Sequence, residues 1–195
     1  PSFGWPVSDY WFGLLDGDDF DPEIIVGRIP AQTEQQVANY IEKAIAFENQ
    51  PNARWMKKFL FLSGGDGELQ RRSFASYRYN VFDKVEPYPI CAETAWVGIK
   101  NFNAGSEEQK NEILSHLNSG TIWTFFFGHA SSQVFDLDGW HVEYMNNKGR
   151  TGFLSTLSCN AGAFAEPFDF HGRNESYVLA KDNGFTHIMM IDSDM

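Results

Sequence analysis

Short apolar runs alternate with amphipathic stretches along this chain, and this alternation limits the fold more than any other feature. The runs are typical of strands, and the stretches between them have the apolar spacing of helices. Strands are predicted at residues 10–15, 23–27, 58–62, 121–127, 152–157 and 185–191, and helices at 33–48, 68–82, 106–120 and 175–181. The pattern predicts an α/β fold with a mainly parallel sheet flanked by helices.

The first long helix has a defined start. Thr33 and Gln36 have the spacing of a capping box, in which each side chain binds a free backbone N–H of the other residue. Val37, Ile41 and Ile45 then recur on one helical face. Residues 86–90 carry two prolines and are expected to be extended or in a loop.

Charge excludes two classes of partner. Lys and Arg number 15 against 26 Asp and Glu, and the net charge is −11. A protein that binds nucleic-acid backbones or anionic membranes needs a basic face, so neither partner is expected. The apolar stretches are too short to cross a bilayer, so no transmembrane segment is expected.

The functional residues are predicted beyond the carboxyl ends of two strands, where parallel sheets gather their active loops. His129 and Cys159 each follow a predicted strand by two residues. An imidazole beside a thiol favours the thiolate nucleophile, and backbone N–H groups at Ala130 and Cys159 could hold an oxyanion. On spacing alone, a structural cysteine and a capping histidine fit equally well. For Cys91, which has no such context, a buried structural thiol is expected.

An acidic stretch near the start could bind calcium through Asp16, Asp18 and Asp21. It is not an EF-hand loop, and a solvated acidic turn is the favoured interpretation. The scattered histidines indicate no transition-metal site.

Several segments, in order, resemble the gingipain-type cysteine peptidases. Residues 127–132 (FGHASS) are similar to their histidine loop, and 158–164 (SCNAGAF) to their nucleophile loop. Residues 24–48 and 175–191 resemble the flanking strand and helix segments of that family.

The resemblance implies a caspase-like fold and hydrolysis of peptide or protein substrates by a Cys–His dyad. Cys159 would be the nucleophile and His129 the base, with the N–H groups of Ala130 and Cys159 at the oxyanion. Glu68, or Asp66 as its competitor, would lie at the bottom of a pocket for a basic substrate residue. The family usually has glycine where this chain has Ala130.

The resemblance also implies how the chain is divided, which cofactors it needs and where the protein is located. Residues 1–55 would form a strand–strand–helix segment that leads into a catalytic subdomain at 56–195, truncated at its C-terminus. No cofactor would be required, with calcium as a structural ion at most. The protein would be secreted or held at the surface or outer membrane of a bacterium. The alternatives are a sortase-like transpeptidase of type IX secretion and an inactive caspase-like scaffold, while the oligomeric state is left open.

Overall fold

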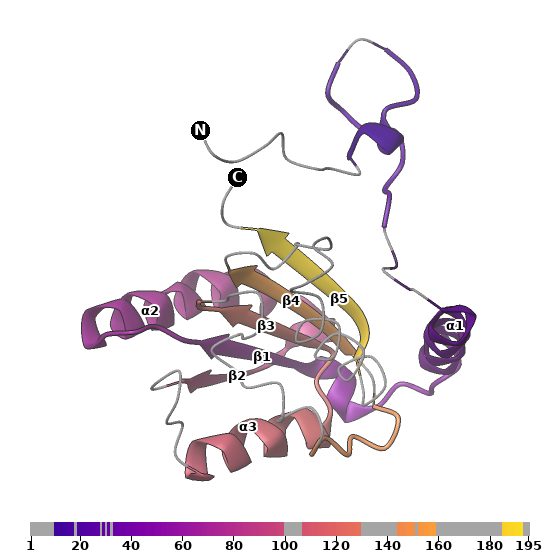
Figure 1. Cartoon of the computed structure of the whole chain (residues 1–195). Coiled ribbons are helices and arrows are strands. Elements are labelled where there is room, and N and C mark those ends of the chain that lie inside the picture. The colour runs from indigo at the N-terminus through magenta and orange to yellow at the C-terminus, as the bar shows by residue number, and fades with distance from the viewer. Residues whose placement is uncertain are drawn as a thin grey trace.

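Five parallel strands form the centre of the molecule (Figure 1). The computed structural model describes residues 10–17, 19–27, 29, 31, 33–99, 107–129, 144–150, 152–158 and, for the backbone, 185–192. The strands are β1 (Lys58–Ser63), β2 (Glu93–Gly98), β3 (Trp123–Phe127), β4 (Gly152–Ser158) and β5 (Phe185–Asp192). They lie in the order β2-β1-β3-β4-β5, so β2 and β5 are the edges. The predicted α/β fold with a parallel sheet is confirmed.

Helices cover both faces of this sheet. The α-helices are α1 (Glu34–Glu48), α2 (Glu68–Val85) and α3 (Glu107–Ser119), and the 3-10 turns are η1 (Tyr10–Gly13), η2 (Arg54–Lys57) and η3 (Pro89–Cys91). In Figure 1, α2 and α3 lie on opposite sides of the sheet, and α1 lies toward the β5 side. The two crossovers β1–α2–β2 and β2–α3–β3 therefore run over different faces.

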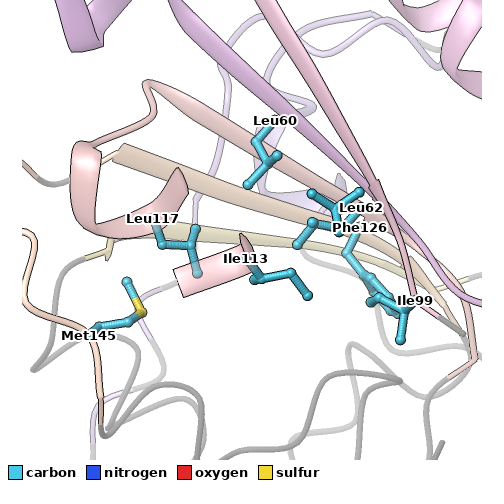
Figure 2. Close-up of a cluster of buried hydrophobic side chains, with 8 residues drawn as sticks. Leu60, Leu62, Ile99, Ile113, Leu117, Phe126 and Met145 are labelled. Atoms are coloured by element: carbon cyan, nitrogen blue, oxygen red, sulfur yellow. The ribbon is translucent and has the colours of Figure 1, made fainter. Parts of the chain in front are cut away.

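Alternate side chains of β1 divide the core between the two faces. Leu60 and Leu62 pack with Ile113 and Leu117 of α3, and Figure 2 shows this cluster with Phe126 and Met145 beside it. The side chains on the other face pack with α2 and with the segment before β1: Phe59, Phe61, Trp55, Cys91, Ile122 and their partly buried neighbours Val81, Phe82 and Val85. Because β1 is buried on both faces, its sequence is a continuous apolar run.

The helix boundaries follow from their capping residues. Thr33 caps α1 as predicted: its Oγ1 accepts the N–H of Gln36 at 3.2 Å, and Gln36 Oε1 accepts the N–H of Thr33 at 3.3 Å. Gly120 ends α3 in the left-handed region, at φ +87°, which glycine adopts without strain. The predicted helix at 175–181 lies outside the described residues.

The structure corrects the sequence interpretation at the N-terminal end and at β2. Residues 10–15 are not a strand, because Tyr10–Gly13 is a 3-10 turn. Residues 23–27 are not a strand either; Gly13 O accepts the N–H of Glu23 and closes a loop that stands clear of the sheet (Figure 1). Strand β2 was not predicted, and the proline-containing stretch before it ends in η3. The division of the chain at residue 55 stays a prediction.

Among the described helices, none is both long and apolar enough to cross a membrane.

Candidate active site

The carboxyl ends of β1, β3 and β4 lie on one side of the sheet, and the described site candidates Asp66, Glu68 and His129 follow two of these strands. Ser63, the last residue of β1, is in register with Phe127 of β3. Phe127 is in turn in register with Leu157 of β4. The loop after β1 therefore begins beside the segment that carries His129, and the end of β4 lies on the other side of β3. Gly64 donates its N–H to Phe127 O at 2.9 Å, and Gly128 donates to Leu157 O at 3.4 Å.

His129 lies on the α2 side of the sheet. Phe125 and Phe127 pack on that side, and the alternation of β3 continues to His129. The ring of Phe74, from α2, lies 5.6 Å from the imidazole, centroid to centroid, with an interplanar angle of 55°. The same Phe74 ring lies 4.4 Å from that of Phe127. The His129 side chain retains 34% of its exposure, so it remains accessible at this edge.

Asp66 is the acidic group beside this histidine. Its Oδ2 lies 3.9 Å from His129 Nε2, a distance that suits an ion contact with a protonated imidazole better than a short hydrogen bond. The Asp66 side chain is 73% exposed, so water and salt screen this contact.

The backbone of Asp66 is held by the first turns of α2. Its N–H donates to Gln70 Oε1 at 2.9 Å, and its carbonyl oxygen accepts from Arg71 Nη1 at 3.5 Å. Gly65 has φ +129°, and a Cβ there would come within 2.9 Å of the Arg71 backbone nitrogen. The loop reaches this position only because residue 65 is glycine.

Glu68 is not buried as the predicted pocket would require. It is the first residue of α2, its side chain is 70% exposed, and its carboxylate pairs with Arg72 one turn along the helix. Glu68 and Asp66 both lie in the segment that joins β1 to α2; Asp66 contacts His129, whereas Glu68 pairs with Arg72. Any role of either acid toward a substrate stays a prediction.

Cys159 and Ala130 lie outside the described residues. Ser158, which precedes Cys159 in the sequence, is the last residue of β4 and is buried, and its hydroxyl lies 2.7 Å from that of Thr156. The Cys159–His129 dyad and the oxyanion donors at Ala130 and Cys159 stay predictions.

The other cysteine is part of the core. Cys91 is 3% exposed and packs with the side chains under α2, as expected for a structural thiol. Burial raises the pKa of this thiol above its ordinary value, because the apolar surroundings disfavour the thiolate. Cys91 is therefore a poor nucleophile at neutral pH.

The acidic stretch has its own internal bonds. Glu23 Oε2 accepts the N–H of Leu15 at 2.7 Å and that of Asp16 at 3.4 Å. The Leu15 bond is the main cause of the lowered pKa of Glu23. Asp16 Oδ1 accepts from Gly17 N, while Asp18 lies outside the described residues. Within the described part of the chain, no group of three or more His, Cys, Asp or Glu side chains could hold a metal. Calcium binding by Asp16, Asp18 and Asp21 stays a prediction.

Sequence reasoning missed two groups of contacts around His129. Phe74 and Tyr77 both pack against Phe127, but the helical spacing of residues 68–82 does not reveal which loop that side of the helix meets. The bond between Gln70 and the backbone of Asp66 could have been predicted from the sequence. Gln70 is the third residue of a helix whose N-cap, Gly67, has no side chain to cap it.

The comparisons with known proteins agree with this architecture. Lys-gingipain from Porphyromonas gingivalis is 24% identical over 168 residues, which are 78% of this chain and 9% of the relative. Lys-gingipain W83 from the same species is 23% identical over 66% of the chain and 7% of the relative. This chain thus spans less than a tenth of the length of these relatives.

The crystal structure of the Arg-specific cysteine proteinase gingipain R has the same fold. It superposes with a TM-score of 0.70 at 17% identity, covering 93% of this chain and 43% of that structure. The complex of the pro- and mature domains of Porphyromonas gingivalis RgpB gives a TM-score of 0.64 at 17% identity, covering 93% and 44%. The family model of peptidase family C25 matches residues 1–191. The resemblance to gingipain-type peptidases is therefore confirmed, and the chain belongs to peptidase family C25.

Proposed function

We propose that this protein is a cysteine endopeptidase in which Cys159 is the nucleophile and His129 is the general base and acid. The observation that carries the proposal is the parallel register of β3 and β4, with Phe127 opposite Leu157. Segments that leave adjacent parallel strands at the same edge come close together, as a dyad requires.

The reaction runs through an acyl-enzyme. His129 takes the thiol proton, and the Cys159 sulfur attacks the scissile carbonyl carbon to form a C–S bond and a tetrahedral oxyanion. Backbone N–H groups of Ala130 and Cys159 stabilise this oxyanion. The C–N bond then breaks, and His129 gives its proton to the leaving amine. Water, deprotonated by His129, cleaves the thioester, and the thiol is restored.

Asp66 is the carboxylate that lies against the imidazole of His129. A carboxylate 3.9 Å from Nε2 stabilises the imidazolium that forms during attack, although exposure limits its effect. An acid in the same segment also favours a basic substrate side chain before the scissile bond. Glu68 is the first candidate for this selectivity, and Asp66 is its competitor. Export from a bacterial cell, expected from the same resemblance, is part of this proposal.

The test is labelling by a peptide probe with a basic residue next to a thiol-reactive group. We expect stoichiometric labelling of Cys159 and none of Cys91, whose thiol is buried. Cys159→Ala should abolish both labelling and peptide cleavage while the far-UV circular dichroism stays unchanged. Cys91→Ala is the matched control and should retain both activities.

Two results would overturn the proposal. One is cleavage that persists in Cys159→Ala. The other is a folded wild-type chain that is labelled equally at both cysteines or at neither, which would favour the inactive scaffold. Product joined to an added amine, rather than to water, would identify the transpeptidase.

A further inference from the structure

The environment of the His129 ring includes an aromatic cluster that no step of the proposed reaction uses. We define this cluster as Phe74, Tyr77 and Phe127. Phe74 contacts both the imidazole and the Phe127 ring, at centroid distances of 5.6 and 4.4 Å. Tyr77 meets Phe127 edge-on at 4.9 Å and 77°. The imidazole therefore lies at one end of a packed row of rings.

Phe74 is supported by a rigid element, whereas His129 lies beyond the end of its strand. Helix α2 is fixed to the sheet by several side chains, among them Val81, Val85 and Phe82, and the Phe82 ring lies 6.1 Å from Phe59 and 6.3 Å from Phe61. Ala75, next to Phe74, is buried. At the other end of the helix, Arg71 and Gln70 hold the backbone of the loop that carries Asp66. One helix thus supports both the ring and the acid that contact His129.

Ring contacts of this kind restrict rotation of an imidazole. Aromatic pairs with centroids 4.5–7 Å apart gain about 0.5–1.5 kcal/mol beyond simple burial and prefer particular angles. A histidine that shuttles protons must keep one nitrogen toward the nucleophile, and a displacement of 1 Å can cost about a hundredfold in rate. A ring held beside the imidazole, tilted by 55° at 5.6 Å, removes the orientations in which the two rings would overlap.

We propose that Phe74 is a positioning residue for His129, which fixes the plane of the imidazole for proton transfer. This inference rests on the proposed function for its effect on catalysis, but the contact itself can be measured without activity. Asp66 lies near Nε2 of the same ring, so the two groups act on different parts of it. Phe74 restrains the face and Asp66 stabilises the charge.

The kinetic test compares Phe74→Leu, Phe74→Tyr and Phe82→Leu. Leucine removes the ring but keeps an apolar side chain, so we expect kcat to fall about tenfold to a hundredfold while KM changes less than about twofold. Tyrosine keeps the ring and should restore most of kcat. Phe82 is a phenylalanine of the same helix that packs on the core. Its loss should lower stability but leave the kcat of the folded protein unchanged.

The second test reads the histidine directly. In the full chain, the imidazole carbon-bound protons of His129 are assigned by comparison with His129→Gln in ¹H–¹³C correlation spectra. The Phe74 ring current acts on these protons, so Phe74→Leu should move them more than those of any other histidine. Phe82→Leu should leave them in place.

The two tests separate the two proposals. Unmoved His129 signals in Phe74→Leu, or equal losses of kcat in Phe74→Leu and Phe82→Leu, would overturn the positioning role. Cleavage that survives Cys159→Ala would overturn the dyad, while the spectra would still decide whether Phe74 holds the ring.

Discussion

Gly64 donates its backbone N–H to the carbonyl oxygen of Phe127 at 2.9 Å, and this bond joins the loop after β1 to the end of β3. The loop continues to Asp66 and the start of α2, while β3 continues to His129. The acid, the ring of Phe74 and the imidazole are therefore all anchored to one pair of neighbouring strands. Changes in this loop should affect His129 even where they do not touch it.

Asp66→Asn should lower kcat/KM about twofold to fivefold, because an amide does not stabilise the imidazolium and an exposed ion pair contributes at most about 1 kcal/mol. The effect should be larger at low than at high ionic strength, since the Asp66 side chain is 73% exposed. Steady-state kinetics at two salt concentrations measure both effects. Asp83→Asn, an exposed acid near the far end of α2, is the control and should change neither. Equal losses in the two variants would contradict the assignment.

Glu68→Gln tests the source of substrate selectivity. The exposed Glu68–Arg72 pair contributes little, so the free energy of unfolding should change by less than about 0.5 kcal/mol. We expect kcat/KM to fall for substrates with Lys or Arg before the scissile bond and to stay unchanged for neutral ones. Asp66→Asn is assayed on the same pair of substrates. If it alone removes the preference for basic residues, Asp66 is the selective acid.

Thr33→Ala should destabilise α1 by about 1 kcal/mol, because the Thr33 hydroxyl accepts the N–H of Gln36, one of the two bonds of the capping box. Urea unfolding or hydrogen exchange of the α1 amides measures the loss. Thr33→Ser retains an acceptor at the same position and should recover most of it. Equal stabilities of Thr33→Ala and Thr33→Ser would show that the residue-33 hydroxyl does not stabilise α1.

Gly152→Ala should destabilise the protein by more than about 3 kcal/mol, since a Cβ there would lie 2.0 Å from Thr121 O and 2.8 Å from Ile122 O. Gly149→Ala is the comparison. Its Cβ would meet nothing within 4 Å, and only the backbone at φ +78° opposes it, at about 1–2 kcal/mol. Urea midpoints should rank the wild type above Gly149→Ala and Gly149→Ala above Gly152→Ala. The reverse order would mean that β4 shifts to accommodate the methyl group.

The raised pKa of Cys91 predicts a loss of stability in alkali. The folded thiol holds its proton more tightly than the unfolded one, so its contribution is fully present below the unfolded pKa, about 8.5. It is lost as pH rises from there through the folded value. Urea unfolding from pH 7 to 10 should show a steeper decline for the wild type than for Cys91→Ala. Parallel curves would show that another group causes the decline.

The buried strands were predictable because burial on both faces leaves a continuous apolar signature. Strand β1 is such a case, and its neighbour β3 was found in the same way. Strand β2 lies at an edge and is mostly half-buried, so its short run between polar and glycine residues does not stand out. Residues 10–15 and 23–27 have strand-like composition but no strand partner among the described residues, and propensity alone does not make a strand.

The position of His129 in the candidate site was predictable from the sequence, but its contacts were not. The rule that functional loops follow the carboxyl ends of parallel strands located His129 beside the loop that carries Asp66. It did not reveal that Phe74 faces the imidazole, because this depends on how α2 lies across β1. It also gave no measure of the exposure of Glu68, which pairs with Arg72 on its own helix.

The alternation of β3 limits which changes this segment can accept in evolution. His129 lies on the α2 side because it continues the odd-numbered positions of Trp123, Phe125 and Phe127. Deleting one residue between Trp123 and His129 would turn the imidazole toward α3. It would also exchange the side chains of the strand that face α2 with those that face α3. A substitution in this segment keeps the alternation, whereas an insertion or deletion keeps it only when two residues are added or removed. The number of residues between the start of β3 and the histidine should therefore vary less among relatives than the identity of those residues.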